Sequence, residues 1–411
     1  MRKVVAIRKE GKEYLAYFLE QRIMLNMNES GAKVLDYFLN QKKDVNEIAK
    51  LIAADYGVDE NEARQDSVKF LKDIYNKLTT TNLNNSESQM LSGPVGCEIE
   101  ITTACNLRCK HCFQGEYPEK YMTFDKFKSI VDILEKNNVY EIHLVGGEIF
   151  KHKDITKMLK YLDKKDVAVT IVTNALGINE EVMNVFCKMH NRLCVLVSID
   201  GTKKLHDFIR GEGVFDKVIP KIKAMRKNDI EVEILCTLNS INVDHIDEIV
   251  ELANELEVPV NFNLFKPFEE CQKFLTVPPE KFFDAVERLL KMRTEKHYRI
   301  GVSDASISAY ELGLPPKNEC TATMSGIVIN TDGKLITCPY LLQAGYYKES
   351  DLPEFDEDFL NTWKNAKMYV DFRKNGQKGC QARSLIFSHD VTKGDPYDVE
   401  AFIKYKQQTQ A

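Results

Sequence analysis

From residue 95 to residue 293 the chain alternates short apolar runs with amphipathic stretches, and this alternation limits the folds that it can adopt. The apolar runs predict strands, and the stretches between them carry apolar residues at helical spacing. Repeated strand–helix units imply a parallel sheet with right-handed crossovers. Six units are too few for a closed eight-stranded barrel, so we predict an α/β fold with a partial (β/α)6 barrel. The strands are predicted at residues 96–102, 140–145, 167–173, 193–199, 232–238 and 259–264, and the helices at 123–137, 154–162, 180–189, 215–226, 243–256 and from 278 onward.

Two further regions flank the predicted barrel, which we place at residues 95–300. Residues 1–85 predict a winged-helix-like α+β module, and the polar, turn-rich stretch at 79–94 is typical of a linker. Residues 301–411 are predicted to be loop-rich and to form a third module. In the first module, strands are predicted at 4–7, 14–18 and 22–25, and helices at 31–38, 45–56 and 60–78.

Composition narrows the class of protein. The net charge of −6 argues against nucleic acid as the main partner. The N-terminus lacks the apolar run of a signal peptide, and no apolar stretch approaches the ~20 residues that span a membrane. We therefore expect a cytoplasmic protein with no membrane partner. In that reducing compartment its 11 cysteines are expected to be metal ligands and buried thiols rather than disulfides.

Three cysteines, Cys105, Cys109 and Cys112, form a CxxxCxxC pattern in TACNLRCKHC. A cubane iron–sulfur cluster is normally held by four cysteines, so three would leave one iron open. The alternative is zinc, but structural zinc sites use four ligands, and no fourth lies nearby. Cys105 directly follows the first predicted strand, and Gly146 follows the second. Both therefore fall on the rim where parallel barrels carry their active sites.

The cysteine pattern together with Gly146-Gly147-Glu148 resembles the radical S-adenosylmethionine (SAM) superfamily. The resemblance implies a TIM-like partial barrel and a [4Fe-4S] cluster on the three cysteines, whose open iron chelates SAM. Electron transfer from the cluster then cleaves SAM to a 5′-deoxyadenosyl radical. By the same resemblance the SAM contacts are His111, Gly146, Gly147, Glu148, Thr173, Asn174, Ser198, Asp200 and Arg210.

Three positions within this pattern need comment. His111 stands before the third cysteine, where the family usually has an aromatic residue near the adenine. Ile149 replaces the proline that often follows Gly-Gly-Glu, so a differently shaped turn is expected. Arg210, in HDFIRG, is assigned to the SAM carboxylate because a guanidinium can bind a carboxylate with two hydrogen bonds. The alternative for Arg210 is a surface ion pair, and Asn239 is a secondary candidate for a SAM contact.

Cys320 and Cys338 bracket a predicted β-hairpin, with strands at 327–330 and 334–337 and an Asp-Gly turn between them. The spacing C-x12-G-x4-C resembles the auxiliary-cluster domains called SPASM and Twitch. Cys380 resembles the next ligand of that family. The resemblance implies one auxiliary iron–sulfur cluster held by these three cysteines.

The full two-cluster pattern is absent, because Gln377 stands where many relatives have a further cysteine. The fourth auxiliary ligand stays open between Cys271, Asp398, Gln377, a substrate thiol and no ligand. The alternative is that the C-terminal cysteines are simply buried thiols. For the remaining cysteines outside both sets, core packing is expected. These are Cys97, Cys187, Cys194 and Cys236.

The N-terminal region, at residues 22–38 and 45–74, resembles the small PqqD peptide-chaperone family of pyrroloquinoline-quinone biosynthesis. The resemblance implies that the leader of a ribosomally synthesised precursor peptide adds as a strand beside the third strand, against the helix at 60–78. A plain winged helix for DNA binding or dimerisation is the alternative, but no basic recognition helix is present. The candidate leader contacts are Arg22, Ile23, Met24, Leu25 and Asn26.

The order of these regions resembles radical SAM maturases of ribosomally synthesised peptides. The resemblance implies a precursor peptide as substrate and an electron donor such as flavodoxin or ferredoxin. A thioether cross-link is the expected product, with carbon–carbon cross-linking, epimerisation and excision as alternatives. Two hypotheses outside this class compete with it. The chain could be a small-molecule enzyme of cofactor biosynthesis, or a degenerate homologue that acts only as a peptide chaperone.

Overall fold

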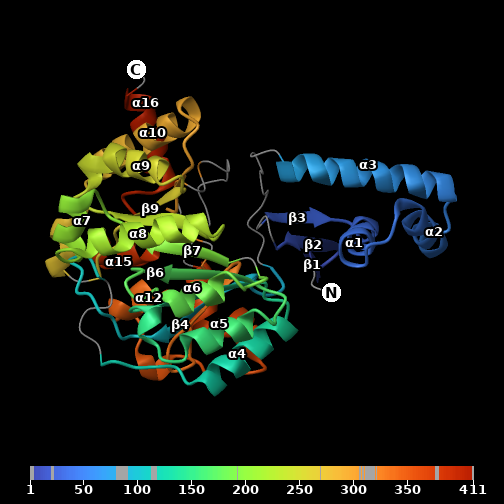
Figure 1. The fold of residues 1–411 in the computed structure, drawn as a ribbon, viewed down its shortest axis with the longest axis horizontal. Helices are drawn as coiled ribbons and strands as arrows, with labels where there is room; N and C mark the ends of the chain where they lie inside the picture. The colour runs from blue at the N-terminus through green and yellow to red at the C-terminus, as the bar shows by residue number, and fades with distance from the viewer. Residues whose placement is uncertain are drawn as a thin grey trace.

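Two sheets organise the computed structural model, a small antiparallel sheet near the N-terminus and a larger, mainly parallel sheet (Figure 1). Among the residues described, no helix is both long and apolar enough to cross a membrane. The structure describes residues 4–19, 23–79, 91–112, 118–191, 193–268, 270–304, 307, 310, 320, 322–374 and 379–409.

The N-terminal module has the three strands and three helices that the sequence predicts. Its strands pair in the order β1-β2-β3, so β3 lies at an edge. Asp44 and Glu47 form a capping box at the start of α2, and Gly57 ends this helix with a φ of +67°. The elements are β1 (Val5–Glu10), β2 (Glu13–Phe18), β3 (Ile23–Met27), α1 (Glu29–Leu35) with a π-helical turn at Asp36–Asn40, α2 (Val45–Tyr56) and α3 (Glu60–Thr79).

The small sheet is covered on both faces. One face packs Phe18, Leu25 and Met27 against residues of α1 and α3. Side chains of the opposite face, with Leu15 and Tyr17 among them, belong to a separate apolar cluster with Val95 and Tyr140. The sheet is therefore a layer between its own helices and the barrel.

The contact with the barrel is specific and polar as well as apolar. The buried guanidinium of Arg8 donates to the carbonyl oxygens of Gly93 (2.8 Å) and Pro94 (2.9 Å). The Tyr17 ring stacks on Tyr140 with 5.8 Å between centroids, and its hydroxyl donates to Glu141. Tyr140 directly precedes strand β5, so the module sits at the N-terminal end of the barrel strands.

The barrel contains the six predicted strands and one more that was not predicted, β10. They pair in parallel in the order β10-β9-β8-β7-β6-β5-β4. The helix Lys203–Arg210 was also not predicted. The strands are β4 (Gly96–Thr102), β5 (Glu141–Gly146), β6 (Ala168–Thr173), β7 (Leu193–Ser198), β8 (Glu231–Leu238), β9 (Val260–Leu264) and β10 (Ile300–Val302). The helices are α4 (Phe124–Lys136), α5 (Ile155–Leu162), α6 (Glu180–Phe186), α7 (Lys203–Arg210), α8 (Val214–Lys227), α9 (Ile246–Glu255) and α10 (Pro279–Glu295).

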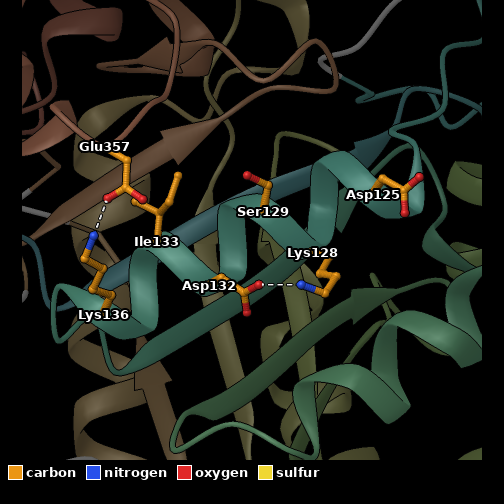
Figure 2. A pocket seen from close by; sticks show the side chains of 7 residues that line it. All are labelled: Asp125, Lys128, Ser129, Asp132, Ile133, Lys136 and Glu357. Carbon is orange, nitrogen blue, oxygen red and sulfur yellow. Dashed lines mark hydrogen bonds and ion pairs between the residues drawn. The ribbon is translucent and has the colours of Figure 1, made fainter.

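Helix α4 illustrates how the outer layer is built. The side chain of Thr123 caps the helix by accepting a hydrogen bond from Lys126 N. The inner face of α4 is buried, while its outer face is charged and shallowly hollowed (Figure 2). There Lys136 pairs with Glu357 at 2.8 Å, which joins α4 to the C-terminal region. These exposed ion pairs contribute little stability.

The C-terminal region extends the barrel sheet. The predicted hairpin is present, and Gly333 has a φ of +83° in its turn. Its first strand runs parallel to β4, so the hairpin continues the sheet beyond β4. The prediction of a loop-rich region was wrong, because five helices follow the hairpin among the described residues, most of them only five to eight residues long. The elements are β11 (Gly326–Ile329), β12 (Leu335–Ile336), α12 (Pro339–Gln343), α13 (Phe359–Asn365), α14 (Lys367–Lys374), α15 (Gln381–Ser388) and α16 (Val399–Thr409).

Three of the four cysteines expected in the core are buried. Cys97, Cys194 and Cys236 lie on strands, with side chains turned into the packed interior. Cys187 is exposed, so its prediction was wrong. It occupies the C-cap of α6, where the chain leaves the helix.

Candidate active site

A cavity of about 690 Å³ opens at the C-terminal ends of the barrel strands. Most of the residues assigned from the sequence line it, although they come from five separate segments. Glu148 and Asp200 do not line it and lie buried behind its wall. The assigned residues that line the cavity are Cys105, Cys109, His111, Cys112, Gly146, Gly147, Thr173, Asn174, Ser198 and Arg210.

The three thiols are presented by one short loop after β4. Cys112 N donates to the Cys109 carbonyl at 3.1 Å, and Leu107 N donates to Cys105 Sγ at 3.4 Å. A bond of 3.0 Å from Lys110 N to the carbonyl of Ile209 anchors the loop to α7. Burial raises the pKa of Cys109 to about 11. Metal binding must therefore displace a proton that this thiol holds at neutral pH.

The donor set fits an iron–sulfur cluster better than zinc. All three thiols line one cavity, and the charges of Cys105, Cys109 and Cys112 influence one another. Within the described part of the chain, no three histidine, cysteine, aspartate or glutamate side chains are grouped as ligands of a single metal ion. Three cysteines of one loop that line one cavity match a cubane cluster with one open iron.

Gly146 and Gly147 bring the end of β5 against the thiol loop. A Cβ on Gly146 would lie 2.3 Å from the carbonyl oxygen of Thr102, and one on Gly147 would lie 2.4 Å from that of Ala104. Neither position has room for a side chain. Because glycine leaves the backbone uncovered, its polar groups can approach a ligand in the cavity.

Glu148 ties the ends of two neighbouring strands together. Its carboxylate accepts hydrogen bonds from Thr173 Oγ1 and Asn174 N, both at 2.7 Å, and from Phe150 N at 3.2 Å. Burial raises the pKa of Glu148, while these bonds oppose that shift. Ile149, in place of proline, begins a short 3-10 turn, Ile149–Lys151. Glu148 therefore shapes the cavity wall from behind.

Asp200 links the thiol loop to α7. Its carboxylate contacts His111 Nε2 at 3.2 Å, binds Arg210 Nε, and accepts a bond from Thr237 N at 2.9 Å. Burial disfavours its ionised form, yet Arg210 and His111 hold the pKa of Asp200 well below its usual range. The Arg210 guanidinium also lies 3.8 Å from Cys109 Sγ. Arg210 thus faces both a buried carboxylate and a candidate cluster thiol.

His111 offers a polar atom to the cavity. Its Nε2 is held by Asp200, whereas its buried Nδ1 has no hydrogen-bond partner among the described residues. An orphaned nitrogen on a cavity wall fits a ligand with polar edges, such as the adenine of SAM. The residues present are therefore suited to hold both a cluster and SAM.

Two supporting residues were not found from the sequence. His206 Nδ1 accepts a bond from Asp200 N at 3.3 Å, and Asn242 Nδ2 donates to the Asp200 carbonyl at 3.1 Å. His206 lies inside the HDFIRG segment, but no local sequence signal predicts its contact with Asp200. Asn239, the secondary candidate, uses its side chain locally, with Thr237 and Ile241 as partners.

The C-terminal cysteines converge in a second place. Cys320, Cys338 and Cys380 belong to one apolar cluster, although they are far apart in the sequence. Burial and the nearby Cys380 raise the pKa of Cys338 to about 12 and that of Cys320 to about 11. Tyr340, two residues after Cys338, lines the main cavity. This second group of thiols therefore lies beside the wall of the first site.

A fully buried ion triad supports Cys380. Arg383 Nη1 pairs with Asp304 at 2.6 Å, and Arg383 Nε donates to Asp395 at 2.8 Å. The Asp395 carboxylate also accepts the backbone N–H of Cys380 at 2.8 Å. Asp398, one candidate fourth ligand, accepts a bond from Ala401 N at the start of α16. Gln377 and the side chain of Cys271 lie outside the described residues.

The predicted leader-binding strand is β3. Within the described residues it pairs only with β2, so its other edge has no strand partner. Ile23 and Leu25 pack toward α1 and α3, Met24 packs toward the barrel side, and Asn26 is exposed. Arg22 lies outside the described residues.

Comparison with known proteins gives two family matches. The Radical SAM superfamily model matches residues 99–256, and the model of Coenzyme PQQ synthesis protein D (PqqD) matches residues 13–77. Mycofactocin maturase MftC of Mycobacterium tuberculosis is 26% identical over 299 residues, which cover 71% of this chain and 75% of MftC. The subtilosin biosynthesis protein AlbA of Bacillus subtilis is 27% identical over 269 residues, covering 64% and 59%.

The fold is also similar to a solved structure. The crystal structure of Streptococcus suis SuiB bound to precursor peptide SuiA superposes with a TM-score of 0.70 at 17% identity. The match covers 96% of this chain and 99% of that one. At this identity the likeness concerns the fold, and it includes both sheets described above.

Proposed function

We propose that this chain, which belongs to the radical SAM superfamily and carries an N-terminal PqqD-like domain, modifies a ribosomally synthesised precursor peptide. One observation carries the proposal. The N-terminal module has a strand edge that is suited to bind a peptide, and specific contacts hold this module at one end of the barrel. The other end of the barrel presents three thiols to a cavity. The relatives include maturation and biosynthesis proteins, and SuiB is a structural neighbour solved with a precursor peptide.

The residues of the cavity divide the work of binding. Cys105, Cys109 and Cys112 would hold a [4Fe-4S] cluster, and the backbone at Gly146 and Gly147 lies open to the methionine part of SAM. When bound, the cluster and SAM supply a 5′-deoxyadenosyl radical. Arg210 places positive charge beside Cys109 Sγ, where a thiolate would form.

We assign the SAM contacts as follows. His111 Nδ1 is the polar group available for the adenine edge, because Asp200 already holds Nε2. Arg210 remains the candidate for the SAM carboxylate, since it lines the cavity and only its Nε and Nη1 are engaged, by Asp200 and by Cys109 Sγ. Thr173, Asn174 and Ser198 line the neighbouring wall.

The product we propose is a thioether between a cysteine sulfur and a carbon of the same peptide. Its formation removes two hydrogens: the carbon-bound hydrogen atom would pass to the deoxyadenosyl radical, the thiol proton to solvent, and the remaining electron to the auxiliary cluster. The C-terminal thiols support this product, because Cys320, Cys338 and Cys380 would supply three ligands of that cluster and leave a coordination place for a substrate thiolate. We further propose that a reduced flavodoxin or ferredoxin supplies the electron.

The test is mass spectrometry of the peptide encoded by a short reading frame beside the gene. The peptide is incubated anaerobically with the reconstituted enzyme, SAM and dithionite in deuterated water. Loss of two hydrogens, with one cysteine protected from alkylation, is the expected result. Deuterium gain without net oxidation would replace the thioether with epimerisation. An unchanged peptide in the presence of deoxyadenosine formation would remove this peptide as the substrate.

A further inference from the structure

The loop that presents three thiols to the cavity has a second face, which is turned to solvent. Arg108 and Lys110 are exposed there, although they alternate in sequence with the candidate ligands. The Arg108 guanidinium donates to the carbonyl oxygens of Cys105 (3.2 Å) and Leu107 (2.9 Å). The positive charge of Arg108 therefore lies on the solvent side of the thiol loop, whose proposed cluster must receive an electron.

Helix α7 adds an exposed aromatic ring to the same face. The Phe208 side chain is 58% exposed, and Lys110 Nζ lies 4.6 Å from its ring centroid. Lys204 is also exposed, and it lies one helical turn before Phe208 on the same side of α7. We call Arg108, Lys110, Lys204 and Phe208 the cluster-loop surface.

Among the described residues, no carboxylate pairs with the cations of this surface. In the described part of the chain, Arg108, Lys110 and Lys204 form no ion pair, whereas the adjacent Lys203 pairs with Asp216. Asp207, on the same helix, binds the N–H groups of Gly213 and Phe215 and not a lysine of this surface. The whole chain carries a net charge of −6. An acidic protein would therefore meet unpaired cations here on a chain that is negative overall.

We infer that the cluster-loop surface is the docking site of an acidic one-electron carrier protein. An exposed aromatic ring between cations is typical of interface residues, which are enriched in aromatic side chains and Arg. Local positive charge steers an acidic partner and fixes its orientation. Docking at this surface would put the carrier one loop away from the cluster ligands. The inference rests on the proposed function, because it supplies the electron donor of that reaction with a site.

The probe is reduced flavodoxin, and the enzyme is the full chain loaded with its clusters. Lys204→Glu and Phe208→Ser are compared with Lys188→Glu, which reverses the charge of an exposed lysine after α6. Calorimetric titration at about 20 mM salt is expected to show a Kd raised about tenfold for Lys204→Glu and unchanged for the control. Phe208→Ser is expected to weaken binding without changing its salt dependence. Iron content and dithionite-driven deoxyadenosine formation are expected to match the parent protein in all three variants.

The two proposals fail in different ways. If flavodoxin binds Lys204→Glu and Lys188→Glu equally well, docking at this surface is wrong, even where dithionite still drives deoxyadenosine formation. If dithionite yields no deoxyadenosine in the parent protein, the proposed function fails, while the titration still decides where flavodoxin binds. The inference is supported if the rate of flavodoxin-driven deoxyadenosine formation falls in parallel with flavodoxin binding while the dithionite-driven rate stays intact.

Discussion

Replacing Arg383 with Met removes the cation from the buried triad that supports Cys380. The Arg383 side chain is 0% exposed, and those of its partners Asp304 and Asp395 are 1% and 0% exposed. Met keeps most of the volume, so the main effect is two carboxylates left in the interior without their cation. Breaking a buried pair in this way costs about 3–5 kcal/mol. We expect a loss of that size in the free energy of unfolding.

The chain has an internal probe for this measurement. Its single tryptophan, Trp363, is fully buried on α13 and donates to the carbonyl of Gly326 at 3.3 Å. Tryptophan fluorescence during urea unfolding therefore reports on the C-terminal region. Arg288→Met is the matched control, because Arg288 pairs with Asp247 on the surface, where both side chains are substantially exposed. The control should lose less than about 1 kcal/mol.

A second measurement connects the triad to the auxiliary thiols. Asp395 accepts the backbone N–H of Cys380, so its displacement should move that cysteine. We expect Arg383→Met to load less iron than the parent protein while its thiol loop after β4 still supports deoxyadenosine formation. A loss of stability below about 1 kcal/mol, equal to that of Arg288→Met, would refute the reasoning that the buried carboxylates depend on Arg383.

Two further predictions concern the first site. Gly147→Ala would place a Cβ 2.4 Å from the Ala104 carbonyl oxygen, and an overlap of this kind costs about 1–3 kcal/mol. We expect SAM binding about tenfold weaker or more by equilibrium dialysis; unchanged binding would show that the backbone is not needed there. Burial lowers the pKa of His206 to about 4 in the folded chain, below the 6.5 of an exposed histidine. As the pH falls, His206 therefore takes up a proton in the unfolded chain before it does so in the folded chain. Stability should drop by about 2 kcal/mol from pH 7 to pH 5, and His206→Asn should flatten that slope in urea unfolding.

The strands and the position of the site could be predicted because the relevant signals are local. Ile99 and Ile101 alternate on β4 in a run with the period of a strand. Parallel strands end on one side of a barrel, so Cys105 and Gly146 had to share a rim. Helix α7 escaped prediction, since its eight residues bury only His206 and Ile209.

Contacts between distant segments could not be predicted in the same way. Asp200 reaches His111 and Arg210, and Arg383 reaches Asp304, but no periodicity relates such positions. Asp304 and Asp395 look like ordinary acidic residues in the sequence, and the family resemblance marked Asp200 only as a SAM contact. Only packing reveals that Asp200 organises the thiol loop and that a triad stands behind Cys380.

The two ends of the barrel carry the two halves of the proposed function. The sheet containing β3 packs on Tyr140, which precedes β5, while the thiol loop follows the far end of β4. The seven residues of β4 span about 23 Å at the usual rise of a strand. A leader bound at β3 must therefore be separated from the modified residue by at least about seven extended residues. Arg8 and Tyr17 hold the module in place. The number of residues between the bound leader and the modified residue would therefore select which residue reaches the cavity, and no movement of the module is required.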